Sequence, residues 1–247
     1  TPEGSTDINA TYIMENTSSG QIIMGGNDSS GMAVNKMGAR PLFLINALNT
    51  GLIETRGLNN YGIALDLNNL NSASSILNKG IINVKGDKSG GIVLKGSIGN
   101  TDDNVVNEGN INITSSTSFG IYSNVSDTKY VNEGNIDLTS AANSIGLRNE
   151  GGLLKNGSNG IINLTNGTNN IGLYSTDGTT ENNGKIIISN GTDNIGIYAK
   201  GSGTSVVNSG EINAVSSGKI KGIAVTDNAD ITNTKDIKLN EIGRAHV

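Results

Sequence analysis

Isoleucine recurs at one fixed place in a pattern of apolar and polar positions that repeats along most of the chain. Each of these isoleucines lies two residues after a glycine, or after Lys235 in the last repeat, and is usually followed by a polar and then an apolar residue. Alternation with a period of two residues predicts a β-strand with one buried face. Nine residues occupy this position: Ile22, Ile53, Ile82, Ile111, Ile136, Ile162, Ile186, Ile212 and Ile237.

Two columns of glycine mark the same repeat. The second column follows the first by 11 residues in four repeats and by 12 in the next four, whereas the return to the first column takes 12 to 20 residues. Insertions therefore concentrate at one corner, as expected for stacked repeats. The first column is Gly20, Gly51, Gly80, Gly109, Gly134, Gly160, Gly184 and Gly210, and the second is Gly31, Gly62, Gly91, Gly120, Gly146, Gly172, Gly196 and Gly222.

Two further strands complete each repeat. Apolar residues directly after the second glycine predict a second strand, and we expect residues two positions earlier in later repeats to face the same interior, namely Phe119, Ile145, Ile171 and Ile195. A short third strand ends at an asparagine, whose side chain we expect to hydrogen-bond along a corner of the stack. These asparagines are Asn49, Asn78, Asn107, Asn132, Asn182, Asn208 and Asn233, while Asn16 and Asn156 lie two residues earlier in their repeats.

Three short strands per repeat cannot bury their faces alone, so each needs a parallel partner in the next repeat. We therefore predict an all-β fold, a right-handed parallel β-helix solenoid of about eight three-strand coils, roughly 38 Å long. We expect residues 1–15 to form a partial coil or N-terminal edge and residues 16–241 to form the β-helix. Residues 242–247 break the pattern and match one reading frame of a sequencing adapter, so we expect a non-native tail.

Composition excludes several classes of protein. Aromatic residues make up 3% of the 247 residues, which argues against a compact enzyme with one thick core, and the 16% charged fraction argues against disorder. No apolar run approaches the length of a membrane-spanning helix. The net charge of −5 offers no basic patch for nucleic acid, and the absence of cysteine excludes disulfides and thiolate metal sites. We expect no metal and no cofactor.

The repeat units resemble a known family. Residues 132–138 (NEGNIDL) and 170–174 (NIGLY) are similar to units in the passenger domains of large autotransporter adhesins, particularly those of fusobacteria, and the resemblance covers residues 16–239. It implies export through a C-terminal β-barrel and display on the outer face of the bacterial outer membrane. It also implies a role in virulence, with a host-cell or bacterial surface protein or glycan as partner. The lack of cysteine fits passage through the periplasm.

One set of outward positions is a candidate binding site. The residue after each inward residue of the second strand should point to solvent, and in four successive coils it is aromatic or basic. Such a ladder, with side chains about 5 Å apart, could stack on sugar rings or engage a protein. Alternatively, tyrosine simply suits an outward strand position and pairs along the ladder. The four residues are Tyr122, Arg148, Tyr174 and Tyr198.

Other candidates are weighed against simpler interpretations. The longest excursions at the variable corner, residues 35–48 with Arg40-Pro41 and residues 66–75, together with Asp127 and Lys129, either carry function or are tolerated insertions. Glu108 and Glu133 occupy equivalent turn positions, which could place two carboxylates at the separation found in retaining glycosidases. Both lie next to corner glycines and no substrate groove is evident, so solvated turn residues are the better interpretation. Asp102-Asp103 reads as a solvated loop.

Three functions follow from this sequence. The first is a surface-displayed passenger that adheres to host or bacterial partners. The second is a passive stalk that presents a distal binding domain. The third, a polysaccharide-active β-helix enzyme, requires a cleft with convergent acidic and basic residues, which the pattern does not provide, so we expect no enzymatic activity.

Overall fold

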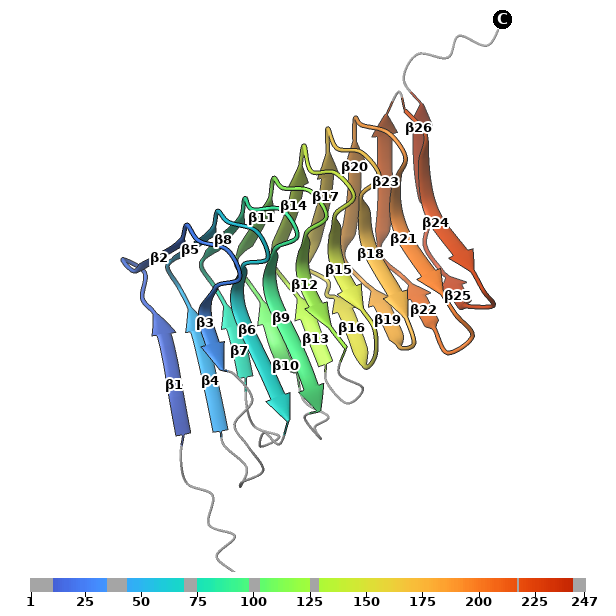
Figure 1. Ribbon diagram of the computed structural model, residues 1–247. Coiled ribbons are helices and arrows are strands. Elements are labelled where there is room, and N and C mark those ends of the chain that lie inside the picture. Colours follow the sequence, from blue (N-terminus) through green and yellow to red (C-terminus); the bar gives the residue numbers. More distant parts are fainter. Residues whose placement is uncertain are drawn as a thin grey trace, which may run out of the picture.

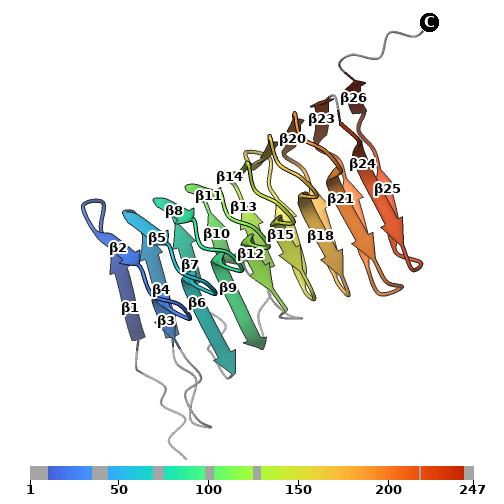
Figure 2. The ribbon, with the colours of Figure 1, turned by 45° about the horizontal axis from the view of Figure 1, so that its top comes forward.

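The structure is a computed structural model that describes residues 11–34, 44–68, 75–97, 103–124, 129–216 and 218–241. These residues form three parallel sheets whose strands follow one another along a single axis, from blue to red in Figures 1 and 2, with no helix among the ranges described. The prediction of an all-β parallel solenoid with three sheets is therefore confirmed. Residues 1–10 and the proposed tail, 242–247, lie outside the described residues.

The three sheets take one strand each from a coil. Sheet A contains the third strand of each predicted repeat: β1 (Thr11–Asn16), β4 (Leu44–Asn49), β7 (Ser75–Asn78), β10 (Asp103–Asn107), β13 (Lys129–Asn132), β16 (Leu153–Asn156), β19 (Thr179–Asn182), β22 (Ser205–Asn208) and β25 (Asp230–Asn233). Sheet B contains the isoleucine strand: β2 (Gln21–Met24), β5 (Leu52–Thr55), β8 (Ile81–Val84), β11 (Asn110–Ile113), β14 (Asn135–Thr139), β17 (Ile161–Thr165), β20 (Lys185–Ser189), β23 (Glu211–Ser216) and β26 (Ile237–Glu241). Sheet C contains the strand after the second glycine: β3 (Ser30–Val34), β6 (Tyr61–Asn68), β9 (Gly90–Ser97), β12 (Phe119–Ser123), β15 (Ile145–Asn149), β18 (Ile171–Thr176), β21 (Asn194–Lys200) and β24 (Ile220–Thr226).

The interior is a column of aliphatic side chains held in register. In sheet B, Ile111 pairs with Ile82 on one side and with Ile136 on the other, so equivalent residues stack at the same height. Each such side chain contributes about 1.5–3 kcal/mol on burial. The seven central isoleucines are completely buried: Ile53, Ile82, Ile111, Ile136, Ile162, Ile186 and Ile212.

A ladder of asparagine amides, buried from Asn16 to Asn208, runs along the corner between sheets A and B. Each side-chain Nδ2 donates to the Oδ1 of the asparagine one coil further, over distances of 2.6 to 2.9 Å. The backbone carbonyl of each residue accepts the N–H groups of the next turn, as Asn78 does from Glu108 and Gly109. The corner therefore leaves few polar groups unpaired. The ladder comprises Asn16, Asn49, Asn78, Asn107, Asn132, Asn156, Asn182, Asn208 and Asn233.

Asn16 and Asn156 belong to this ladder despite their offset in sequence. Asn16 pairs with Asn49, and Asn156 pairs with Asn132 and Asn182. Their additional residues lie in the turn that follows, where Gly160 donates its N–H to the carbonyl of Gly157. The extra length is absorbed after the asparagine, so the ladder keeps its register.

The corner between sheets B and C holds a second ladder that the sequence analysis missed. A buried serine or asparagine accepts the backbone N–H of the equivalent residue one coil earlier, at 2.9 to 3.1 Å. The residue before each has a φ of 52 to 57°, which asparagine and aspartate tolerate better than other residues with a side chain. The acceptors are Asn60, Ser89, Ser118, Ser144, Asn170 and Asn194.

The prediction that Phe119 and its equivalents face the interior is wrong. Gly120 itself faces inward, because a Cβ there would lie 3.0 Å from Cγ2 of Ile136, and the next residue, Ile121, is also buried. Two successive inward positions reverse the alternation, so the residue before the glycine lies on the outer face of sheet C. The other residues of this column are Ile145, Ile171 and Ile195.

Candidate functional site

The four outward positions singled out in the sequence lie side by side on sheet C. Tyr122 is half-buried between the fully enclosed Ile121 and Ser123, which places its ring on the outer face. In the sheet register Tyr122 pairs with Arg148, Arg148 with Tyr174, and Tyr174 with Tyr198. The structure thus brings the four side chains together across four adjacent strands, while their role in binding stays a prediction.

These side chains contact one another along the stack. The guanidinium carbon of Arg148 lies 5.2 Å from the ring centroid of Tyr122 and 6.0 Å from that of Tyr174. The Tyr174 and Tyr198 rings follow with centroids 5.6 Å apart and planes tilted by 47°. Cation–π contacts of this kind contribute about 0.5–1 kcal/mol at exposed sites. These contacts between neighbouring side chains stabilise the arrangement of the four residues.

Glu150 holds Tyr122 and Arg148, at one end of this row of four side chains. Its Oε2 accepts a hydrogen bond from the Tyr122 hydroxyl at 2.8 Å, and its Oε1 accepts one from Arg148 Nε at 2.8 Å, with Arg148 Nη2 also in contact. Burial, together with the hydrogen bond to this carboxylate, raises the pKa of Tyr122 to about 12. Tyr122 therefore remains a hydrogen-bond donor throughout the physiological range. At the other end, the hydroxyl of Tyr198 lies 3.0 Å from that of Thr226.

Two more aromatic residues extend this surface, and the sequence analysis did not assign them to it. The Phe119 ring lies 5.5 Å from that of Tyr122 and 6.1 Å from that of Tyr61, with an angle of 28° between the planes in the second pair. Phe119 covers Gly90 on the intervening strand, where a Cβ would collide with the ring. We name the aromatic strip as the set Tyr61, Phe119, Tyr122, Arg148, Tyr174 and Tyr198.

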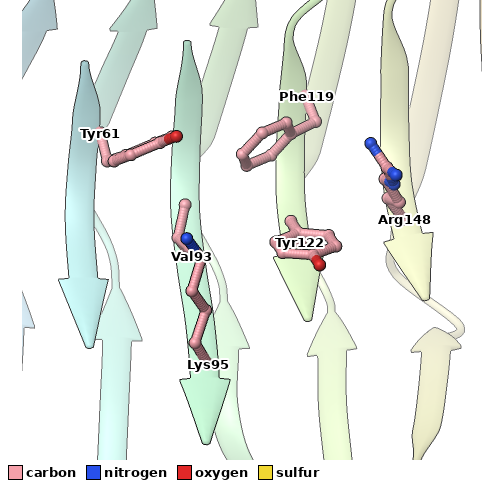
Figure 3. Close-up of a pocket in the computed structure, with 6 residues that line it drawn as sticks. All are labelled: Tyr61, Val93, Lys95, Phe119, Tyr122 and Arg148. Carbon is pink, nitrogen blue, oxygen red and sulfur yellow. The ribbon is translucent and has the colours of Figure 1, made fainter. Parts of the chain in front are cut away.

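A depression lies within the strip at β9, a strand that carries no aromatic residue. Tyr61 on β6 and Phe119 on β12 form its walls, and Val93 lies between them (Figure 3). Lys95 Nζ lies 6.0 Å from the centroid of the Tyr61 ring. The depression has a volume of about 230 Å³ and is lined by Tyr61, Val93, Lys95, Phe119, Tyr122 and Arg148.

A second depression adjoins the first at Tyr61. It has a volume of about 260 Å³ and is lined by Asp28, Ser30, Asn59 and Tyr61. Asn59 Nδ2 donates to Asp28 Oδ1 at 3.0 Å, so amide and carboxylate groups form one wall. Tyr61 separates an aromatic and basic hollow from a polar one.

Glu108 and Glu133, the equivalent turn residues, have different partners. Glu108 forms an ion pair with Lys79 of the preceding coil, at 3.3 Å. Glu133 instead accepts the backbone N–H of Asn159 in the following coil at 3.0 Å. Glu108 thus interacts with the preceding coil and Glu133 with the following coil.

The variable corner is only partly described. Within the predicted excursions, residues 44–48 belong to β4, residues 66–68 to β6, and Ser75 begins β7, so these parts are strand rather than loop. Residues 35–43, including Arg40-Pro41, and residues 69–74 lie outside the described residues, as do Asp102 and Asp127. Asp103 belongs to β10 and pairs in register with Lys129, the first residue of β13, so Asp103 is strand and not loop.

Within the described ranges, no three His, Asp or Glu side chains gather where they could hold a metal ion. The same ranges contain no apolar helix long enough to cross a membrane. Comparison with protein-family models, with curated proteins and with solved structures yielded no match.

Proposed function

We propose that this chain is part of the passenger of an autotransporter-type adhesin, displayed on the outer surface of a bacterial outer membrane. In this proposal it binds a host-cell or bacterial surface protein or glycan through the aromatic strip. The observation that carries the proposal is the stacking of Tyr122, Arg148, Tyr174 and Tyr198 across four adjacent strands. Tyrosine and arginine are among the residues enriched at binding hot spots.

The scaffold supports such a role. We infer a right-handed solenoid of about eight coils, since parallel crossovers are almost always right-handed. Glu150 and Thr226 hold the hydroxyl groups of Tyr122 and Tyr198, so less side-chain entropy is lost when a partner binds. A rigid sheet thereby presents side chains whose orientation is already fixed.

The test is direct binding of the purified chain to host cells and to bacterial surfaces. A variant with all four ladder residues changed to alanine should lose most of the binding while it keeps the circular dichroism spectrum of the fold. The matched control carries four alanines on the outer face of sheet B, at Asn83, Asn112, Asn163 and Asn213. Unchanged binding by the strip variant would remove the proposal.

A passive stalk is the alternative, and the two hydrogen-bonded corner ladders favour it. The asparagine ladder alone continues without interruption from Asn16 to Asn233. Such regularity suits a spacer as well as a binding module. A stalk predicts that the isolated chain binds neither cells nor surface polymers.

We propose no catalytic role for this stretch, because Glu108 and Glu133 pair with different partners. Incubation with pectin- or rhamnan-like polymers should release no reducing ends. Release by the wild-type chain that is lost in a Glu133→Gln variant would support a polysaccharide-active enzyme instead.

A further inference from the structure

We propose that the outer face of sheet C binds a linear polysaccharide that carries carboxylate groups, with one carboxylate beside Lys95. The inference rests on the proposed function, because it assigns a ligand class to the same aromatic strip. It is drawn from the shape of the strip, the groups that border it and the position of its cations.

The strip is long and narrow. It runs across the strands from Tyr61 on β6 to Tyr198 on β21, which are five strand spacings apart, or roughly 24 Å. Along it, the Tyr61 and Phe119 rings lie 6.1 Å apart and the Tyr174 and Tyr198 rings lie 5.6 Å apart. The guanidinium of Arg148 lies between Tyr122 and Tyr174, at 5.2 and 6.0 Å from their ring centroids. A ligand that uses the whole strip must be an extended chain with flat groups along its length. The pyranose rings of a linear polysaccharide meet this requirement.

The surroundings favour a sugar over a protein partner. A protein hot spot needs an apolar centre that is sealed from water. The exposed large hydrophobic residues of the described chain lie outside the sheet C strands from β6 to β21, and on this face the partly buried Ile145, Ile171 and Ile195 accompany the strip. The polar depression beside Tyr61 instead offers the carboxylate of Asp28 and the amide of Asn59, which suit sugar hydroxyl groups.

The cations of the first depression favour an acidic sugar. Lys95 and Arg148 both line it, and Lys95 takes part in none of the ion pairs formed among the described residues. Arg148 contacts Glu150 through Nε and Nη2, which leaves other guanidinium N–H groups for a ligand.

Binding of defined oligosaccharides by the full chain tests this assignment. Hyaluronan, polygalacturonate and alginate oligosaccharides serve as carboxylated probes, chito-oligosaccharides as neutral probes, and poly-glutamate as an anion without sugar rings. The wild-type chain should bind at least one carboxylated oligosaccharide more tightly than the other two kinds of probe. Lys95→Gln should weaken that binding about tenfold, since a charge-assisted hydrogen bond is lost, and should leave neutral sugars unaffected.

Tyr174→Ala should weaken both acidic and neutral sugars by a similar factor, because it removes a stacking surface. Asn112→Ala on sheet B is the control and should change neither. All variants should keep the thermal unfolding midpoint of the wild type to within a few degrees.

Three results would overturn the assignment: no binding of any carboxylated oligosaccharide, equal binding of poly-glutamate, or indifference to Lys95→Gln. Adhesion to cells that depends on the strip, without any response to these sugars, would refute the ligand class alone. If the wild-type chain neither adheres to cells nor binds any of these oligosaccharides, the adhesin proposal is refuted as well.

Discussion

The buried asparagine ladder makes a strong prediction about Asn132, one of its central members. Its side chain is fully enclosed, accepts from Asn107 Nδ2 at 2.8 Å, and donates to Asn156 Oδ1 at 2.9 Å and to the carbonyl of Gly134 at 3.1 Å. Asn132→Ala removes both links of the ladder at once. Asn107 Nδ2 keeps a bond to Gly109 at 3.2 Å, whereas the Oδ1 of Asn156 loses its donor from the ladder.

The magnitude follows from the groups left without partners. A buried polar group that loses its hydrogen bond costs about 1–3 kcal/mol, so two disrupted neighbours predict a loss of about 2–6 kcal/mol in the free energy of unfolding. Asn132→Asp should be worse at neutral pH, because it buries a charge and sets oxygen against oxygen at Asn156. Burial raises the pKa of such a carboxyl, so the stability of this variant should recover partly as the pH falls and the group becomes protonated.

Urea denaturation followed by far-UV circular dichroism measures these differences. Asn135→Asp is the matched control, because Asn135 lies three residues away, is half-exposed and donates to Asn110 at 3.1 Å on the outer face of sheet B. We expect it to cost less than about 1 kcal/mol. Equal losses for Asn132→Asp and Asn135→Asp would refute the idea that the ladder stabilises the corner.

Further substitutions probe the interior, a turn and an ion pair. Ile136→Asp should destabilise the chain far more than Asn135→Asp in the same denaturation series, since it buries a charge in the aliphatic column. Thr55→Val should raise the unfolding free energy by about 1 kcal/mol, because the buried Thr55 hydroxyl has no hydrogen-bond partner among the described residues; a loss would contradict this. Thr117→Asn should stabilise by up to about 1 kcal/mol, measured by thermal melting, because Thr117 holds a φ of 57° and a β-branched residue is strained there. Lys85 and Arg56 lower the pKa of Glu54 from 4.5 to about 2, so the stability from these ion pairs is fully present above pH 4.5 and is lost as the pH falls towards 2. Glu54→Gln should therefore reduce the dependence of the unfolding free energy on pH between 4.5 and 2, measured by urea denaturation at several pH values.

The sequence predicted the isoleucine strand well for a physical reason. Burial in a stack demands the same side-chain type at the same height, so Ile111, Ile136 and Ile162 follow their glycines at an invariant distance. The outward positions from Tyr122 to Tyr198 could be predicted in the same way, because each directly follows an inward residue of its strand. Neither inference needed the length of the variable corner.

Other features were hidden by local backbone geometry. A glycine that faces inward, such as Gly120, reverses the alternation, so Phe119 was assigned to the wrong face and the first part of the aromatic strip was missed. The second ladder escaped notice because serine and asparagine share it, as at Ser144 and Asn170, although each lies two residues before a second-column glycine. That constant spacing from the glycine could have identified the second ladder in the sequence.

The register of the asparagine ladder has a consequence for how such a chain can change in length. Asn107 and Asn132 are 25 residues apart and occupy equivalent positions in successive coils, so the segment from one to the other is one complete coil. Copying or excising a whole coil would join two surfaces that already match, whereas a shift of one or two residues within a strand would not. Tandem duplication could thus extend the outer face by about 4.8 Å at a time without any redesign of the interior.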